Sequence, residues 1–152
     1  MSPPAGGRLA ENRPPGGGFP PGRAGARARR CAHVPVSVLI VDDHSGFRRR
    51  ARRLLEAEGF DVVGEAGNGR HGVEAARALS PDLVLLDVNL PDTDGFAVAE
   101  ELARDDPAPA VVITSTRDAA DVADRVRACG ARGFVPKDEL SGAALDAVLA
   151  ER

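Results

Sequence analysis

VSVLIVDDHSGFRRRARRLLEAEG, residues 36–59, holds one complete strand-and-helix unit and decides the fold class of this chain. The residues up to Val41 are mostly apolar and β-branched, which predicts a strand that ends at two aspartates. Residues 45–58 carry apolar side chains at helical spacing and predict a helix with one buried face. Ser45 is its expected N-cap, and Gly59 fits the position after its last turn. The apolar positions of this helix are Phe47, Ala51, Leu54 and Leu55.

The alternation of strand and helix is repeated four more times downstream. The predicted strands cover 60–65, 83–86, 110–113 and 133–135. The predicted helices cover 69–79, 96–103, 119–129 and 142–150. Ser141 is expected to cap the last helix, and the buried side of the first of these helices is expected to hold Val73, Ala76 and Leu79. Five such units predict an α/β fold with a doubly wound, five-stranded parallel sheet.

The first 34 residues differ in composition from the rest of the chain. Residues 1–33 contain 13 Pro and Gly, and residues 1–34 carry six Arg and one Glu. Such a segment buries too little apolar surface to offset its ordering entropy, so we expect a disordered tail over 1–34 and a folded domain over 35–152. One alternative is that translation starts near Val34. Another is that the tail contacts nucleic acid through Arg27, Arg29 and Arg30.

The charge and the thiols of the folded part restrict its partners and location. Residues 35–152 hold 22 acidic and 14 basic side chains, so we do not expect this part to bind DNA by itself. No apolar run reaches the roughly 18 residues of a membrane-spanning helix, and the chain begins without a secretory signal. Cys31 and Cys129 lack metal-ligand spacing and are typical of a reducing compartment. The sequence therefore predicts a cytoplasmic protein with no membrane partner.

Polar side chains stand at the predicted carboxyl ends of four strands. Asp42 and Asp43 follow the first strand, and Asp87 follows the third. Ser115 comes after the fourth strand, and the only lysine of the chain, Lys137, follows the fifth. These ends meet at one edge of an open parallel sheet, where ligands bind. Carboxylates this close repel one another, so the cluster predicts a Mg²⁺ site, and the ammonium beside it suits a phosphoryl group.

Four segments carry a resemblance to a known family. They are VLIVDDH (38–44), LVLLDVNLPDTDG (83–95), VVITS (111–115) and GFVPKD (133–138). Together they resemble the receiver domain of two-component response regulators over residues 36–150. The resemblance implies a flavodoxin-like sheet with strand order 2-1-3-4-5. It also implies phosphorylation by a sensor histidine kinase with Mg²⁺ as the cofactor.

The resemblance assigns the acceptor and the metal ligands. Asp87 resembles the phosphoacceptor, whose carboxylate forms an aspartyl phosphate and also binds the metal. Asp43 resembles the direct Mg²⁺ ligand, and Asp42 resembles its neighbour that acts mainly through water. Asn89 would offer its main-chain carbonyl to the metal.

Three further positions resemble those that respond to the phosphoryl group. Lys137 resembles the lysine that pairs with a phosphoryl oxygen, and Ser115, 22 residues before it, resembles the switch hydroxyl. Thr114 stands where an aliphatic residue is common, so the choice between the two hydroxyls needs a check. Phe134 occupies the position of the switch aromatic, and its alternative role is packing in the core.

Two features near the acidic pair have simpler interpretations. His44 is unsuitably spaced from His33 and His71 for a metal site, so we interpret it as a loop residue. Five arginines on the helix over 45–58 are interpreted as a solvated face, with a docking patch for a partner kinase as the alternative. They are Arg48, Arg49, Arg50, Arg52 and Arg53.

The resemblance implies a phosphorylation-controlled switch that is not an enzyme toward other substrates. Because the sequence stops at Arg152, we expect no output domain, and a readout through an unknown downstream protein or a homodimer. One alternative is a DNA-binding regulator that acts through its Arg-rich tail, and another is a phosphate sink that drains a kinase. A hydrolase with an Asp nucleophile is disfavoured, because Asn89 stands where a second acid would lie.

Overall fold

The computed structural model describes residues 34–150, and residues 35–150 form one compact unit. The hypotheses about the first 33 residues, namely disorder, nucleic-acid contact and a later start of translation, lie outside the described residues. Among the helices over 34–150, none combines the length and the apolar character that a bilayer crossing requires.

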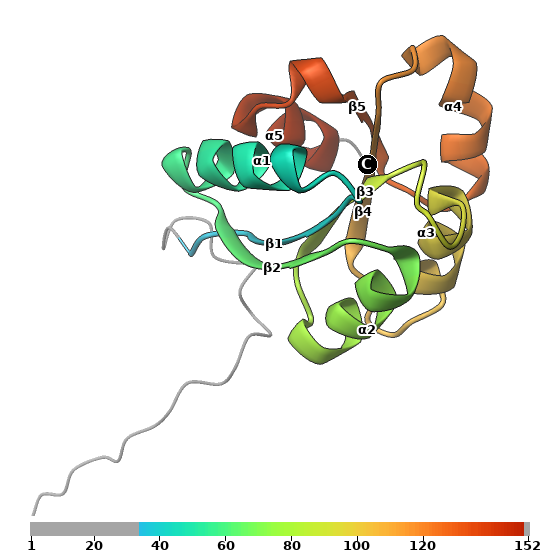
Figure 1. The fold of residues 1–152 in the computed structure, drawn as a ribbon, viewed down its shortest axis with the longest axis horizontal. Coiled ribbons are helices and arrows are strands. Elements are labelled where there is room, and N and C mark those ends of the chain that lie inside the picture. The colour runs from blue at the N-terminus through green and yellow to red at the C-terminus, as the bar shows by residue number, and fades with distance from the viewer. Residues whose placement is uncertain (1–33, 151–152) are drawn as a thin grey trace, which may run out of the picture. The chain divides into compact units, whose positions relative to one another are not determined.

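Over residues 34–150, five strands alternate with five helices in the order that the sequence predicts (Figure 1). The strands are β1 (Ser37–Val41), β2 (Asp61–Ala66), β3 (Leu83–Asp87), β4 (Ala110–Ser115) and β5 (Gly133–Pro136). The helices are α1 (Ser45–Ala57), α2 (Gly69–Leu79), α3 (Gly95–Ala103), α4 (Ala119–Ala128) and α5 (Gly142–Ala150). A short 3₁₀ helix, η3 (Lys137–Glu139), also follows β5, and it is too short for hydrophobic periodicity to reveal.

The sheet is parallel throughout, and its order β2-β1-β3-β4-β5 confirms the predicted flavodoxin-like topology. β1 pairs with β3, with Val41 opposite Leu86, and β3 pairs with β4, with Asp87 opposite Thr114. The strand order reverses between β1 and β3. The carboxyl ends of these two strands therefore border the crevice where open α/β sheets bind ligands.

Helices cover both faces of the sheet (Figure 1). An aliphatic cluster lies between the helices and the sheet on each face. α1 and α5 cover one face and bury Leu55 and Leu145, while α2, α3 and α4 cover the other and bury Ala99 and Leu102. Few polar side chains are buried in the part of the chain that the structure describes. They are Asp42, Asp87, Thr114 and Ser115, and all lie at the carboxyl edge of the sheet.

Two of the predicted helix ends are confirmed. Gly59 follows α1 with a φ of +96°, a conformation that glycine adopts without a steric penalty. The hydroxyl of Ser141 accepts a hydrogen bond from Ala144 N–H at 3.0 Å and caps α5. Sequence signals at these ends are reliable because each depends on one local conformation.

Two other predictions about helices are wrong. Ser45 is the first residue of α1 and not its N-cap, because His44 N–H donates to Asp42 Oδ1 at 2.8 Å and takes the extended N-cap conformation. Leu79 is 41% exposed and not buried, because it ends α2 over the outermost strand, β2. Val73 and Ala76, earlier in the same helix, are buried as predicted.

The loop over 88–94 leads from β3 to α3 and is held at several points. Gly95 N–H donates to the Val88 carbonyl at 2.8 Å, and the Asp94 carboxylate caps the first turn of α3. Asp92 accepts hydrogen bonds from the first two backbone N–H groups of α2, at 2.8 and 3.0 Å. The segment that follows Asp87 is thus fixed to two helices.

Gly95→Ala should destabilise the domain, because the added Cβ would overlap the Asp87 carbonyl oxygen and lie 2.9 Å from Val88 Cα. Main-chain atoms cannot yield as a flexible side chain can, so we expect a loss of about 2 kcal/mol in the free energy of unfolding. Gly46→Ala is the matched control, since nothing lies within 4 Å of its Cβ and α1 gains helix propensity. Urea denaturation followed by circular dichroism measures both, and equal stabilities would contradict the packing argument.

Candidate functional site

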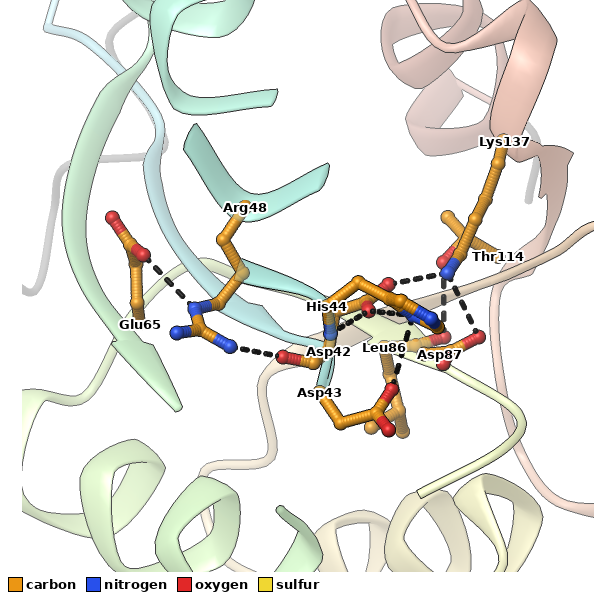
Figure 2. A network of polar contacts seen from close by, with 9 residues as sticks. All are labelled: Asp42, Asp43, His44, Arg48, Glu65, Leu86, Asp87, Thr114 and Lys137. Carbon is orange, nitrogen blue, oxygen red and sulfur yellow. Dashed lines mark hydrogen bonds and ion pairs between the residues drawn. The ribbon is translucent and has the colours of Figure 1, made fainter. Parts of the chain in front are cut away.

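Four charged side chains meet at the carboxyl edge of the sheet (Figure 2). Asp42 and Asp43 follow β1, and Asp87 ends β3. Lys137 follows β5, and its Nζ lies 2.6 Å from Asp42 Oδ2 and 3.4 Å from Asp87 Oδ1. The structure therefore brings together the three aspartates and the lysine that the strand ends predict.

Burial gives this cluster its unusual electrostatics. The side chains of Asp42 and Asp87 are 1% and 4% exposed, whereas that of Asp43 is 37% exposed. Burial and the neighbouring Asp42 carboxylate raise the pKa of Asp87, while Lys137 and the Asn89 N–H oppose the rise. The cluster therefore carries more negative charge than its one ammonium group balances.

The carboxylate oxygens at this edge form a donor set for a metal ion. Asp42 Oδ2 is buried and makes no hydrogen bond, although Lys137 Nζ lies within ion-pair distance. Buried carboxylate oxygens rarely lack a hydrogen bond. Asp42, Asp43 and Asp87 each offer an oxygen within 4.8 Å of the others. Mg²⁺ binds oxygen ligands of this kind and keeps part of its water shell, so the donor set suits it.

Arg48 fixes the main chain at the acidic pair. Its Nη1 donates to the Asp42 carbonyl at 2.6 Å, and its Nε donates to Glu65 on β2 at 3.0 Å (Figure 2). Arg52 binds the other carboxylate oxygen of Glu65 at 2.7 Å. The prediction of a solvated arginine face therefore holds for only some of the five arginines of α1. Arg48 and Arg52 instead bind Glu65 on β2. The exposed members are Arg49, Arg50 and Arg53.

The remaining predicted residues lie around the cluster. Ser115 Oγ accepts a hydrogen bond from Arg117 N–H at 3.0 Å, and Thr114 Oγ1 lies 3.5 Å from the Leu86 carbonyl. Both hydroxyl groups are buried and bind main-chain groups here. Phe134 is partly buried against the cluster beneath α2, α3 and α4. The switch roles of Ser115 and Phe134 stay predictions.

A cleft of about 760 Å³ opens beside the acidic cluster. Phe47 from α1, Thr116 after β4 and Asp138 in η3 contribute to its lining. Lys137 Nζ lies 4.7 Å from the centre of the Phe47 ring, which is a cation–π contact. Because Asp43 and Lys137 also line this cleft, it gives solvent and other molecules access to the cluster.

Sequence reasoning missed three contributors to this site. Helical spacing identifies Phe47 as a core residue but cannot show that Lys137 lies over its ring. Arg48 stands six residues after Asp42, a spacing that could have suggested a bond back to the loop. His44 directly follows the acidic pair, and its Nδ1 lies 3.2 Å from Asp43 Oδ1. Its position next to Asp43 in the sequence was the signal that could have identified His44 as part of the site.

Known proteins similar to this chain share one domain. Residues 38–149 match the family described as response regulator receiver domain. The chain is 41% identical over 106 residues to the transcriptional regulatory protein PdtaR of Mycobacterium tuberculosis, which covers 70% of this chain and 51% of PdtaR. It is 41% identical over 110 residues to a protein-glutamate methylesterase/protein-glutamine glutaminase of Alkalilimnicola ehrlichii, which covers 68% of this chain and 27% of that protein.

Solved structures show the same likeness. The signal receiver domain of NarL from Mycobacterium tuberculosis matches with a TM-score of 0.68 and 33% identity, over 77% of this chain and 98% of that chain. A two-component response regulator of the LuxR family from Aurantimonas matches with a TM-score of 0.71 and 30% identity, over 78% of this chain and 88% of that chain. The chain spans about half of PdtaR and about a quarter of the methylesterase, so the likeness concerns the shared domain.

Asp87→Asn should stabilise the metal-free domain at neutral pH, because it removes one of two carboxylates that are buried together. A raised pKa means that folded Asp87 holds its proton more tightly than the unfolded chain does. Its charge therefore costs stability once the pH rises above the ordinary pKa of 3.8. The advantage of the variant should grow as the pH rises through the raised pKa and level off at about 1 kcal/mol.

Urea denaturation in EDTA at several pH values measures this effect. Asp61→Asn is the control, because Asp61 is an exposed carboxyl on β2, and its stability should stay close to that of the wild type. An Asp87→Asn variant that is less stable than the wild type at neutral pH would contradict the electrostatic cause.

Arg48→Gln should weaken Mg²⁺ binding roughly tenfold, because it releases the Asp42 carbonyl and with it the loop that carries the acidic pair. Arg52→Gln is the matched control, because it also removes an ion pair to Glu65. The other hydrogen bonds of Arg52 go to Glu56 and to the Val62 carbonyl, and none goes to the loop that carries the acidic pair. Titration calorimetry gives both affinities, and urea denaturation gives both stabilities. Equal losses of affinity would mean that Arg48 acts only through the fold.

Proposed function

The chain belongs to the response regulator receiver domain family of two-component systems, and we propose that Asp87 is its phosphoacceptor. Receiver domains act as phosphorylation switches, and histidine kinases phosphorylate them. One observation supports the assignment most strongly: Lys137 reaches between the buried carboxylates of Asp42 and Asp87, at the crevice between β1 and β3. An ammonium group there suits the oxygens of a phosphoryl group on Asp87.

In the proposed reaction, a carboxylate oxygen of Asp87 attacks the phosphorus of a phosphohistidine on a sensor kinase. The bond from phosphorus to the imidazole nitrogen breaks, and that nitrogen keeps the electron pair and takes up a proton. Asp87 becomes an aspartyl phosphate. Lys137 then pairs with a phosphoryl oxygen and offsets part of the charge that burial makes costly. Attack by water on the phosphorus later returns the free carboxylate and inorganic phosphate.

The proposed Mg²⁺ site consists of Asp42, Asp43, Asp87 and the main-chain carbonyl of Asn89. Asp43 and Asp87 would bind the ion directly, and Asp42 mainly through water. When bound, Mg²⁺ supplies positive charge that reduces the repulsion between the acceptor and the incoming phosphoryl oxygens. Three carboxylates lie together here beside one ammonium group, and this excess of negative charge supports a further cation at this place.

Ser115 and Phe134 are the proposed switch residues. Ser115 Oγ would leave Arg117 N–H and bind a phosphoryl oxygen, which draws the loop after β4 toward Asp87. Phe134, which is partly buried, would then change its packing. These movements alter the face formed by α4, β5 and α5, and that face would bind a downstream protein or a second copy of the chain.

We propose that the domain catalyses only its own phosphorylation and dephosphorylation, and that it works in the cytoplasm. We do not propose the methylesterase activity named for the Alkalilimnicola relative, because this chain matches only 27% of that protein. Cys129, a free and buried thiol, is typical of a reducing compartment. The excess of acidic side chains in residues 35–152 argues against DNA as a partner of the domain itself.

Intact mass spectrometry after incubation with acetyl phosphate and Mg²⁺ tests the assignment. We expect one added phosphoryl group in the wild type, and none in Asp87→Asn or in the presence of EDTA. Asp138→Asn is the matched control, because Asp138 is an exposed carboxyl beside Lys137 that lines the same cleft, and it should accept the group as the wild type does. A phosphoryl group that persists in Asp87→Asn would place the acceptor elsewhere.

A further inference from the structure

His44 brings an imidazole ring to the acidic cluster. It is the N-cap of α1, and its backbone N–H donates to Asp42 Oδ1 at 2.8 Å. Its ring Nδ1 lies 3.4 Å from Asp42 Oδ1 and 3.2 Å from Asp43 Oδ1 (Figure 2). The side chain makes no capping bond to the helix, so α1 does not require a histidine at this position.

The spacing of these atoms is close to that of ligands around one octahedral ion. Metal–ligand bonds of about 2.0–2.1 Å put neighbouring ligand atoms about 2.9 Å apart and opposite ones about 4.2 Å apart. The distances from His44 Nδ1 to the two aspartate oxygens exceed the neighbouring distance by a few tenths of an ångström. Asp42, Asp43, His44 and Asp87 each offer a ligand atom within 4.8 Å of all the others. A small shift would therefore place the nitrogen, Asp43 and Asp87 around a single ion, with Asp42 close enough to contact it through water.

The Asp42 side chain lies where the negative charge exceeds the positive charge beside it. It is 1% exposed, and its Oδ2 has no hydrogen-bond partner among the described residues. Its other oxygen, Oδ1, already accepts the His44 N–H. Lys137 provides one positive charge near Oδ2, whereas three carboxylates surround the space. A divalent ion beside the imidazole ring would balance the remaining negative charge.

We infer that His44 provides a nitrogen ligand through Nδ1, so that this site accepts divalent first-row transition ions as well as Mg²⁺. The inference rests on the proposed metal site and adds one ligand to it. Imidazole suits ions such as Ni²⁺ and Zn²⁺, whereas Mg²⁺ strongly prefers oxygen. Removal of His44 therefore weakens the binding of transition ions and spares that of Mg²⁺.

Pulsed electron paramagnetic resonance of the full chain loaded with Mn²⁺ tests the nitrogen ligand directly. An imidazole nitrogen bound to Mn²⁺ modulates the electron spin echo. We expect this modulation in the wild type and in His71→Gln, and its loss in His44→Gln. His71 is the matched control, because it is an exposed histidine on α2 outside the cluster. Circular dichroism checks the fold of each variant.

Titration calorimetry with Ni²⁺ and with Mg²⁺ provides the second readout. His44→Gln should weaken Ni²⁺ binding at least about tenfold and change the Mg²⁺ affinity by less than about twofold. Mn²⁺ that binds without nitrogen modulation, or equal losses for both ions, overturns the role of His44 and leaves the receiver site standing. Protein that binds neither ion and accepts no phosphoryl group overturns the receiver site as well.

Discussion

Asp42 and Asp87 are buried close together at the ends of adjacent strands, and the rest of the site depends on this pair of carboxylates. Two such charges in a crevice with little solvent need a cation beside them. That cation is the ammonium group of Lys137, which follows β5 in a distant part of the sequence. Its Nζ lies 2.6 Å from Asp42 Oδ2. The pair exists only because the topology makes β1 and β3 neighbours. The strand order therefore determines which charged groups meet at the site.

The carboxylate pair is held from two sides by contacts outside the crevice. On one side, Arg48 links the Asp42 carbonyl to Glu65 on β2. On the other, the loop after Asp87 is joined to α2 by Asp92, and Asp94 forms an ion pair of 2.9 Å with Arg125 on α4. A change at Asp87, the proposed acceptor, would therefore reach α4 through this ion pair as well as through the proposed switch residues.

The sequence predicts the five strand–helix units to within a few residues, because each element buries a whole face and shows it in its periodicity. Strand ends then suffice to bring Asp87 and Lys137 together, since that rule depends only on topology. His44 and Arg48 lie beyond such reasoning, because their contacts depend on the hydrogen bonds of one short loop. The error at Ser45 has the same origin, since the bond between His44 and Asp42 decides where α1 begins.

Lys137 is the only lysine in the sequence, and its side chain is 12% exposed at the cleft. Apart from the chain's own amino terminus, an acylating reagent or enzyme therefore has one amine to modify, and that amine supplies the positive charge beside Asp42 and Asp87. The 19 arginines keep their charge under acylation, so the surface would stay unchanged. A single acyl transfer would remove the ammonium charge between Asp42 and Asp87 and leave the two buried carboxylates without it.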